Sequence, residues 1–172
     1  MTGNPFTRNY MADLIIWKFD NVIIKNLFDK EAYDEMLVRL NKLTPGSQRL
    51  WGKMNVSQML AHCKAAFKVP LSDKPLRKLF PLSLIGPLLK SKLYNDTPWS
   101  HGLPTAPEFK ITDERDFETE KKGLLELVNK FYTSGPGGTG KYPHPVFGKF
   151  TSEQWGKAMW KHLDHHMRQF GV

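Results

Sequence analysis

Residues 147–170 have the sequence FGKFTSEQWGKAMWKHLDHHMRQF, which is typical of one amphipathic helix preceded by its start signal. Thr151 and Gln154 match the Thr-x-x-Gln pattern of a capping box, in which each side chain hydrogen-bonds the backbone N–H of the other residue. At about 100° per residue, one stripe of this helix carries Trp155, Met159, His162, Leu163, His166 and Phe170. The segment therefore predicts a helix that starts at Thr151 and turns this stripe toward a core.

Histidine is concentrated in this predicted helix, which holds three of the six histidines of the chain. His162 and His166 are four residues apart, so their side chains lie one turn apart on the same face. This spacing lets two imidazoles reach one metal ion, as in other helical His-x-x-x-His sites. His165 borders the same stripe on its flank.

A second histidine-bearing helix is predicted after Trp51-Gly-Lys-Met54. Asn55 is a suitable N-cap, and Gln58 completes the same kind of capping box. Helical spacing then continues through Met59, His62, Cys63, Ala66 and Val69, until Pro70 ends it. His62 lies at the edge of the apolar face and is expected to point toward a neighbouring helix. Cys63, about 100° away, is expected to pack in the core.

Two further helices complete an all-α fold. One is expected from about Asp29, a good N-cap, to Leu43. The other is expected from Thr112 or Asp113 to Tyr132, with solvated acidic residues in its first turns, where the helix dipole favours them. A single domain over residues 1–172 is predicted, because this length and the 40% hydrophobic content are those of one globular domain.

Three segments are less regular. Residues 1–27 are interpreted as an N-terminal arm, either strand-like or irregular. Prolines from Pro70 to Pro107 interrupt residues 70–110, although residues 79–93 can form one or two short helical turns. A connection of this length in a compact domain is usually a functional cover or lid. Residues 134–141 are rich in glycine but fail the phosphate-loop pattern, because Tyr142 follows Lys141, and they are interpreted as a flexible turn.

Composition excludes several classes of protein. The single cysteine rules out an intrachain disulfide and favours a reducing compartment. No segment approaches the roughly 18–20 apolar residues that cross a bilayer. The N-terminus also lacks the basic region, long apolar core and small-residue cleavage site that follow one another in a signal peptide. A cytoplasmic location with no membrane partner is expected.

The net charge is +8, which raises the question of an anionic partner. Basic residues are nevertheless spread along the chain, and no nucleic-acid-binding motif accompanies them, so nucleic acid is disfavoured. Lys157, Lys161 and Arg168 are predicted on the polar side of the last helix. Solvated basic faces are the expected explanation of the charge, and attraction of an anionic substrate is the alternative.

Imidazoles directed into a core need partners, since an unpaired buried polar group costs roughly 1–3 kcal/mol. Carboxylates and backbone groups can satisfy them, or a metal ion can. Two histidines on one stripe, together with His62 on a helix with a parallel start, favour the metal. Three protein nitrogens on Zn²⁺ or Ni²⁺ leave room for water or substrate, which is typical of a catalytic site.

The two histidine blocks also carry a family resemblance. The pattern Trp51-Gly-Lys-Met-x-x-x-Gln-Met-Leu-x-His62, followed by His144-Pro-x-Phe-Gly and Lys161-His-Leu-Asp-His-His-x-x-Gln-Phe170, resembles the DinB/YfiT-like superfamily, in an uncharacterised branch. The resemblance covers roughly residues 28–172. It implies a four-helix bundle of up-down-down-up topology, here with a long Pro-rich connection between helices two and three. It also implies a divalent metal held by His62, His162 and His166.

The function implied by the resemblance is that of a metal-dependent hydrolase or thiol S-transferase acting on a small molecule, with a low-molecular-weight thiol as a candidate partner. His165 and His144 are candidates for proton transfer or for support of the ligands, because histidine titrates near neutral pH. Gln58 and Gln169 can orient ligands, with capping and surface roles as the simpler alternatives. The main functional alternative is a helical bundle that binds a metal or small ligand without turnover, and a homodimer is left open.

Overall fold

The computed structural model describes residues 24–172, so most of the proposed N-terminal arm lies outside the described residues. Its α-helices are α2 (Lys30–Lys42), α3 (Val56–Phe67), α4 (Leu82–Leu89), α5 (Phe117–Gly138) and α6 (Ser152–Gln169). Two short 3-10 helices, η1 (Lys90–Leu93) and η2 (Pro107–Phe109), lie between α4 and α5. Residues 24–172 contain no strand and only one isolated bridge, between His144 and Gly148. The described chain is therefore all-α, as predicted.

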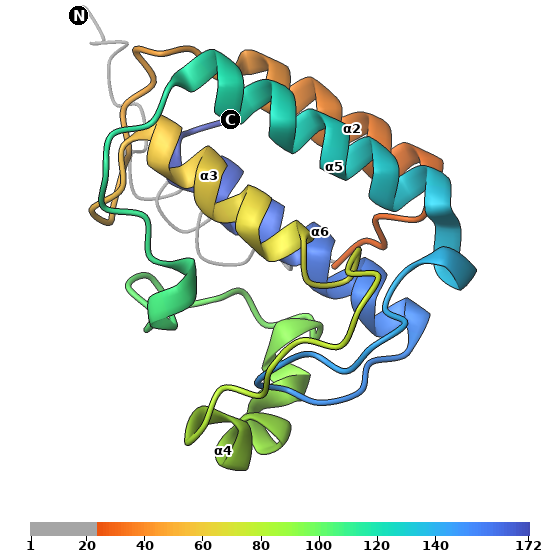
Figure 1. The fold of residues 1–172 in the computed structure, drawn as a ribbon. Coiled ribbons are helices and arrows are strands. Elements are labelled where there is room, and N and C mark those ends of the chain that lie inside the picture. Colours follow the sequence, from red (N-terminus) through yellow and green to blue (C-terminus); the bar gives the residue numbers. More distant parts are fainter. Residues whose placement is uncertain (1–23) are drawn as a thin grey trace, which may run out of the picture.

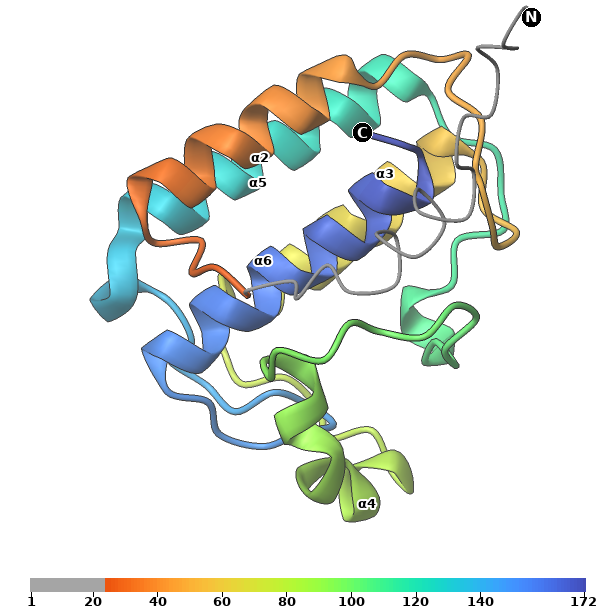
Figure 2. The same ribbon diagram turned by 180° about the vertical axis from the view of Figure 1, so that it is seen from behind.

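Four long helices surround one core (Figure 1). α3 packs most extensively on α5, and α2 packs on α6. The two views agree that α2 and α6 run in one direction while α3 and α5 run in the opposite one (Figure 2). The largest fully buried side chains come from all four helices and include Met36, Phe67, Phe131, Leu163 and Met167.

The starts of α3 and α6 are fixed by the two capping boxes that the sequence predicts. Asn55 accepts from the Gln58 N–H at 2.9 Å, and the Gln58 side chain accepts from the Asn55 N–H at 3.0 Å. Thr151 and Gln154 repeat the arrangement at 3.2 and 3.1 Å. Both histidine-bearing helices therefore begin at defined residues, and this fixes the position of each histidine along its helix axis.

The boundaries of α2 agree with the expectation, whereas those of α5 differ at both ends. Asp29 occupies the N-cap position of α2 but makes no side-chain cap hydrogen bond. α5 begins at Phe117 and not near Thr112, because the Asp116 side chain accepts from the Thr119 N–H at 2.8 Å and caps the helix there. It extends past Tyr132 to Gly138 with a kink at Gly135, whose backbone is non-helical (φ 62°), so the glycine-rich segment contains a break followed by a short helical stretch.

The long connection between α3 and α5 contains α4 and η1, which lie in the predicted short helical stretch, followed by η2. α4 projects from the side of the long helices (Figure 1), whereas η1, which follows it, lies against α6. η2 lies against α3. Among the described residues, no helix has both the length and the apolar character needed to cross a membrane.

Candidate metal centre

Three imidazoles meet between α3 and α6. His62 comes from α3, and His162 and His166 lie one turn apart on α6. One ring nitrogen from each lies within 4.8 Å of the other two, and all three residues are buried. The closest approach is 2.9 Å, between Nε2 of His62 and Nε2 of His162. In the described chain, no cysteine or carboxylate joins this group of possible ligands.

The orientation of His62 is set by the connection that precedes α5. Its Nδ1 lies 2.8 Å from the backbone carbonyl oxygen of Phe109 in η2. A carbonyl oxygen only accepts, so Nδ1 carries the hydrogen and Nε2 presents its lone pair toward the other histidines. A hydrogen bond to the remaining ring nitrogen is the usual support for a metal-ligating histidine.

Gln169 orients His166 in the same way. The Gln169 Nε2 donates to the Trp51 carbonyl oxygen at 2.8 Å, which assigns the amide and leaves Oε1 facing His166 Nδ1 at 2.8 Å. Gly52 makes this possible: its φ is 83°, and a Cβ there would lie 2.4 Å from Gln169 Nε2. Gln169 is buried, so the surface role considered for it is wrong. Gln58, in contrast, serves as the α3 capping residue.

Burial keeps the three imidazoles neutral. Desolvation lowers the pKa of His62 and lowers the pKa of His166 to about 3. The pKa of His162 lies well below its usual value, first because of burial and then because of the neighbouring His166 and His62. Neutral imidazole is the form that binds metal, so all three side chains have the required protonation state at neutral pH.

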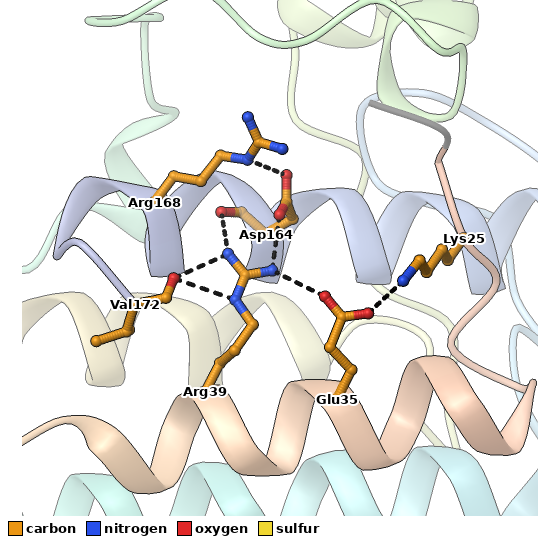
Figure 3. Close-up of polar contacts among 6 residues, drawn as sticks. All are labelled: Lys25, Glu35, Arg39, Asp164, Arg168 and Val172. Atoms are coloured by element: carbon orange, nitrogen blue, oxygen red, sulfur yellow. Dashed lines mark hydrogen bonds and ion pairs between the residues drawn. The ribbon is translucent and has the colours of Figure 1, made fainter. Parts of the chain in front are cut away.

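Asp164 lies between the two α6 histidines in sequence, and an ionic network with α2 holds it in place (Figure 3). Arg39 Nη1 lies 2.7 Å from Asp164 Oδ1, and Arg168 Nε lies 2.9 Å from Oδ2. Arg39 Nε also donates to the Val172 carbonyl oxygen at 3.1 Å. Both Asp164 oxygens are therefore engaged, and the network fixes the C-terminal part of α6, with its histidines, against α2.

His165 borders the cluster. Its ring centroid lies 5.2 Å from that of His166, 5.5 Å from that of Trp99 and 6.0 Å from that of Trp51. It lines a small pocket together with both tryptophans and His101. Burial, and then the nearby His101, lower the pKa of His165 to about 4.

His144 lies elsewhere. Its Nδ1 accepts from the backbone N–H groups of Val146 and Phe147 at 3.0 and 3.3 Å, inside the turn closed by the bridge to Gly148. Its ring packs beside Trp155, which precedes His162 by seven residues on α6, or about 10 Å along the helix axis. Burial lowers the pKa of His144 to about 4. The structure therefore does not bring His144 into the histidine cluster.

Lys161 does not lie on a solvated face, contrary to the prediction. It is 2% exposed, and its Nζ donates to the carbonyl oxygens of Lys92 and Asn95 and to Asn95 Oδ1, each at 2.8 Å. Burial lowers its pKa to about 8, against an opposing effect of Asp96. The connection between α3 and α5 covers this side of α6, a tertiary contact that helical periodicity does not contain.

Trp99 is brought to the site by the same connection, and the sequence gives no signal for it. Its Nε1 donates to the Lys92 carbonyl oxygen at 2.8 Å, the oxygen that Lys161 also binds. Its ring centroid lies 5.8 Å from that of His162. Trp99, Phe109 and Gly52 are thus residues of the site that the sequence analysis missed, although Gly52 stands in the Trp-Gly-Lys motif that begins the resemblance.

Cys63 follows His62 on α3 but faces the core. It is fully buried, with Sγ 3.7 Å from Met59 Sδ, and burial raises the pKa of its thiol. The prediction of core packing is confirmed.

The fold and the site together define an all-helical protein with three buried histidines arranged as a candidate metal centre. The chain belongs to the DUF1569 family, described as a protein of unknown function, whose model matches residues 25–171. No curated protein and no solved structure matches the chain.

Proposed function

We propose that this chain is a divalent-metal-dependent enzyme of the DinB/YfiT-like type, with His62, His162 and His166 as the ligands of Zn²⁺ or Ni²⁺. The observation that carries the proposal is the convergence of three buried, neutral imidazoles. Two of them have Nδ1 paired with a fixed acceptor, so Nδ1 carries the hydrogen and Nε2 keeps its lone pair for a metal. Imidazole is a ligand suited to both metals, and three protein ligands leave a coordination position open.

The spacing of the donors suits such an ion. At Zn–N distances of about 2.0–2.1 Å, two ligating nitrogens lie roughly 2.9–3.4 Å apart. The pair formed by His62 and His162 already has this separation, at 2.9 Å. The opposite directions of α2 and α6 relative to α3 and α5 support the proposed up-down-down-up bundle.

When bound, the metal would supply Lewis acidity and lower the pKa of a water or thiol. The chain supplies the remaining functions. Gln169 and the Phe109 carbonyl hold two ligands in the required tautomer. His165 is neutral at pH 7 and lies beside the cluster, so its imidazole can accept a proton only transiently, because a pKa of about 4 makes it a weak base. We assign proton transfer to His165, and support of the turn before α6 to His144. The proposed reaction is hydrolysis or thiol S-transfer on a small molecule.

Metal analysis of the purified protein tests the site. We expect about one Zn²⁺ or Ni²⁺ per chain and a rise in Tm when either ion is added to metal-depleted protein, because a ligand that binds the folded state stabilises it. His62→Ala and His162→Ala should lose both effects. His101→Ala, which removes an exposed imidazole outside the trio, should retain them. A wild-type protein that contains no metal, and whose Tm does not change when Zn²⁺ or Ni²⁺ is added, would contradict the proposal.

The reaction class is tested on the metal-loaded protein. Activity toward electrophilic small molecules that depends on an added low-molecular-weight thiol indicates transfer, whereas activity on ester or amide substrates without thiol indicates hydrolysis. If the protein binds the metal but shows neither transferase nor hydrolase activity, its function is non-catalytic binding of a metal or small ligand.

A further inference from the structure

α4 and Phe80, two residues before its start, present apolar side chains to solvent. We define the α4 tip as the exposed residues Phe80, Leu82, Leu84, Ile85, Leu88 and Leu89. Phe80 is 79% exposed and Leu88 is 83% exposed. An exposed cluster of large apolar residues normally marks an interaction site, because its contact with water is unfavourable.

Contacts on the opposite side of α4 fix the position of the α4 tip relative to the rest of the fold. Gly86, on the opposite side of α4 from Leu84 and Leu88, is buried against Val146, and a Cβ at Gly86 would lie 2.3 Å from the Val146 carbonyl oxygen. The Leu79 N–H donates to the Pro145 carbonyl oxygen at 3.0 Å. The ammonium of Lys90 lies 4.8 Å from the centroid of the Phe150 ring. The apolar side chains are therefore held outward by packing on the other side of the helix.

The segment that carries the tip is strongly basic. Residues 74–95 include Lys74, Arg77, Lys78, Lys90 and Lys92 and contain no aspartate or glutamate. Within residues 24–172, none of these five cations forms an ion pair. Lys90 faces the supporting side of α4, where its Nζ also donates to the Lys149 carbonyl oxygen. The cations next to the apolar tip in sequence are therefore Lys74, Arg77, Lys78 and Lys92, and the nearest acidic residues are Asp73 and Asp96, just outside this segment.

The combination of exposed apolar side chains and nearby cations indicates which kind of partner binds the α4 tip. A second copy docked tip to tip would bring the two sets of cations together, and like charges repel. Nucleic acid would bind the cations but leave the leucines in water. An anionic bilayer accommodates both features, since its headgroups attract lysine and arginine while its acyl region accepts the apolar side chains.

We propose that the α4 tip docks this protein on the surface of an anionic lipid bilayer. The projection of α4 away from the long helices lets the tip reach a flat surface without hindrance from the rest of the fold (Figure 1). Docking of this kind inserts side chains to a shallow depth and needs no spanning helix. The sequence-based expectation of no membrane partner concerns segments that span the bilayer, and shallow docking is a different kind of contact.

Co-sedimentation of the full chain with vesicles tests the proposal. We expect binding to vesicles of phosphatidylcholine mixed with phosphatidylserine and little binding to phosphatidylcholine alone. Added salt should weaken the binding, because it screens the attraction between cations and headgroups. Equal binding to both vesicle types, or no binding to the anionic ones, would overturn the proposal.

Two matched pairs of variants separate the apolar and the charged contributions. Leu84→Ser with Leu88→Ser should reduce the partition coefficient by roughly tenfold or more, whereas Val38→Ser, at an exposed apolar position on α2, should not. Arg77→Gln with Lys78→Gln should also reduce it about tenfold, whereas Lys122→Gln with Lys130→Gln, an equal charge change on α5, should have little effect.

Circular dichroism and Tm of each variant report whether the fold is retained, and the single Leu88→Ser change provides a milder form of the apolar test. Tip variants that bind as tightly as the wild type would overturn the proposal. So would a wild-type dimer that the tip variants convert to monomer in the absence of any vesicle binding, since the tip would then serve self-association.

Discussion

Gln169 links a turn, a helix and a candidate ligand through one amide. Its Nε2 is bound by the Trp51 carbonyl oxygen, so its Oε1 is directed at His166 Nδ1. The arrangement depends on the absence of a side chain at Gly52, which leaves room for the amide. The tautomer of His166 is thereby set by residues that bind no metal themselves.

Gln169→Leu removes this support while keeping a side chain of similar size. We expect the affinity for Zn²⁺ or Ni²⁺ to fall about 10- to 100-fold, as when other hydrogen-bond partners of ligating histidines are removed. Competition with a chelator of known affinity measures the change. Gln154→Leu, which removes the capping glutamine of the same helix, should lower stability but leave metal affinity unchanged. An unaltered affinity in Gln169→Leu would show that the amide does not position His166.

At the scale of the helices, the starts of α3 and α6 determine where the histidines lie. Each has a complete capping box, and each is followed by the histidine-bearing turns at a fixed distance along the helix. α2 differs, since Asp29 stands at the N-cap position without a side-chain hydrogen bond to the backbone.

This difference gives a prediction about stability. Thr151→Ala should lower the free energy of unfolding by about 1 kcal/mol, because it leaves a backbone N–H of α6 without its acceptor. Asp29→Ala should lower it by less, since no side-chain cap bond is lost. Urea unfolding of the two variants beside the wild type measures both changes. A loss in Asp29→Ala equal to or larger than that in Thr151→Ala would contradict the assigned caps.

At the scale of the whole molecule, the network around Arg39 joins α2 and α6, the first and last of the described long helices. Arg39 contacts Asp164 and the Val172 carbonyl oxygen, and it extends through Glu35 toward Lys25 (Figure 3). Arg39 and Asp164 are both largely buried, with side-chain exposures of 13% and 9%. Removal of Arg39 therefore leaves a poorly solvated Asp164 carboxylate with the exposed Arg168 as its ion-pair partner.

Arg39→Met should destabilise the fold by about 3 kcal/mol, the usual effect of removing one member of a buried ion pair. Lys30→Met, which breaks the exposed pair with Asp34, should have little effect, because exposed pairs contribute little. Urea unfolding measures both variants. A small loss in Arg39→Met would mean that apolar packing alone holds α6 against α2.

Much of the site is present in local sequence patterns. The two capping boxes and the helical spacing place His62, His162 and His166 on inward-facing stripes, because cap chemistry and a period of 3.6 residues are properties of short segments. The burial of Cys63 follows from the same periodicity. The class of fold is also local information, since each long helix has its own apolar stripe.

Tertiary structure alone decided what surrounds these histidines. The Phe109 carbonyl, Trp99 and the partners of Lys161 all reach the site through the irregular connection between α3 and α5, whose path no periodic pattern specifies. Helical spacing predicts Lys161 on a polar face, because it describes one helix in isolation. The same spacing puts His162 toward α3, but only the packing of α6 against both α3 and the connection determines that His162 meets His62 and that Lys161 is covered.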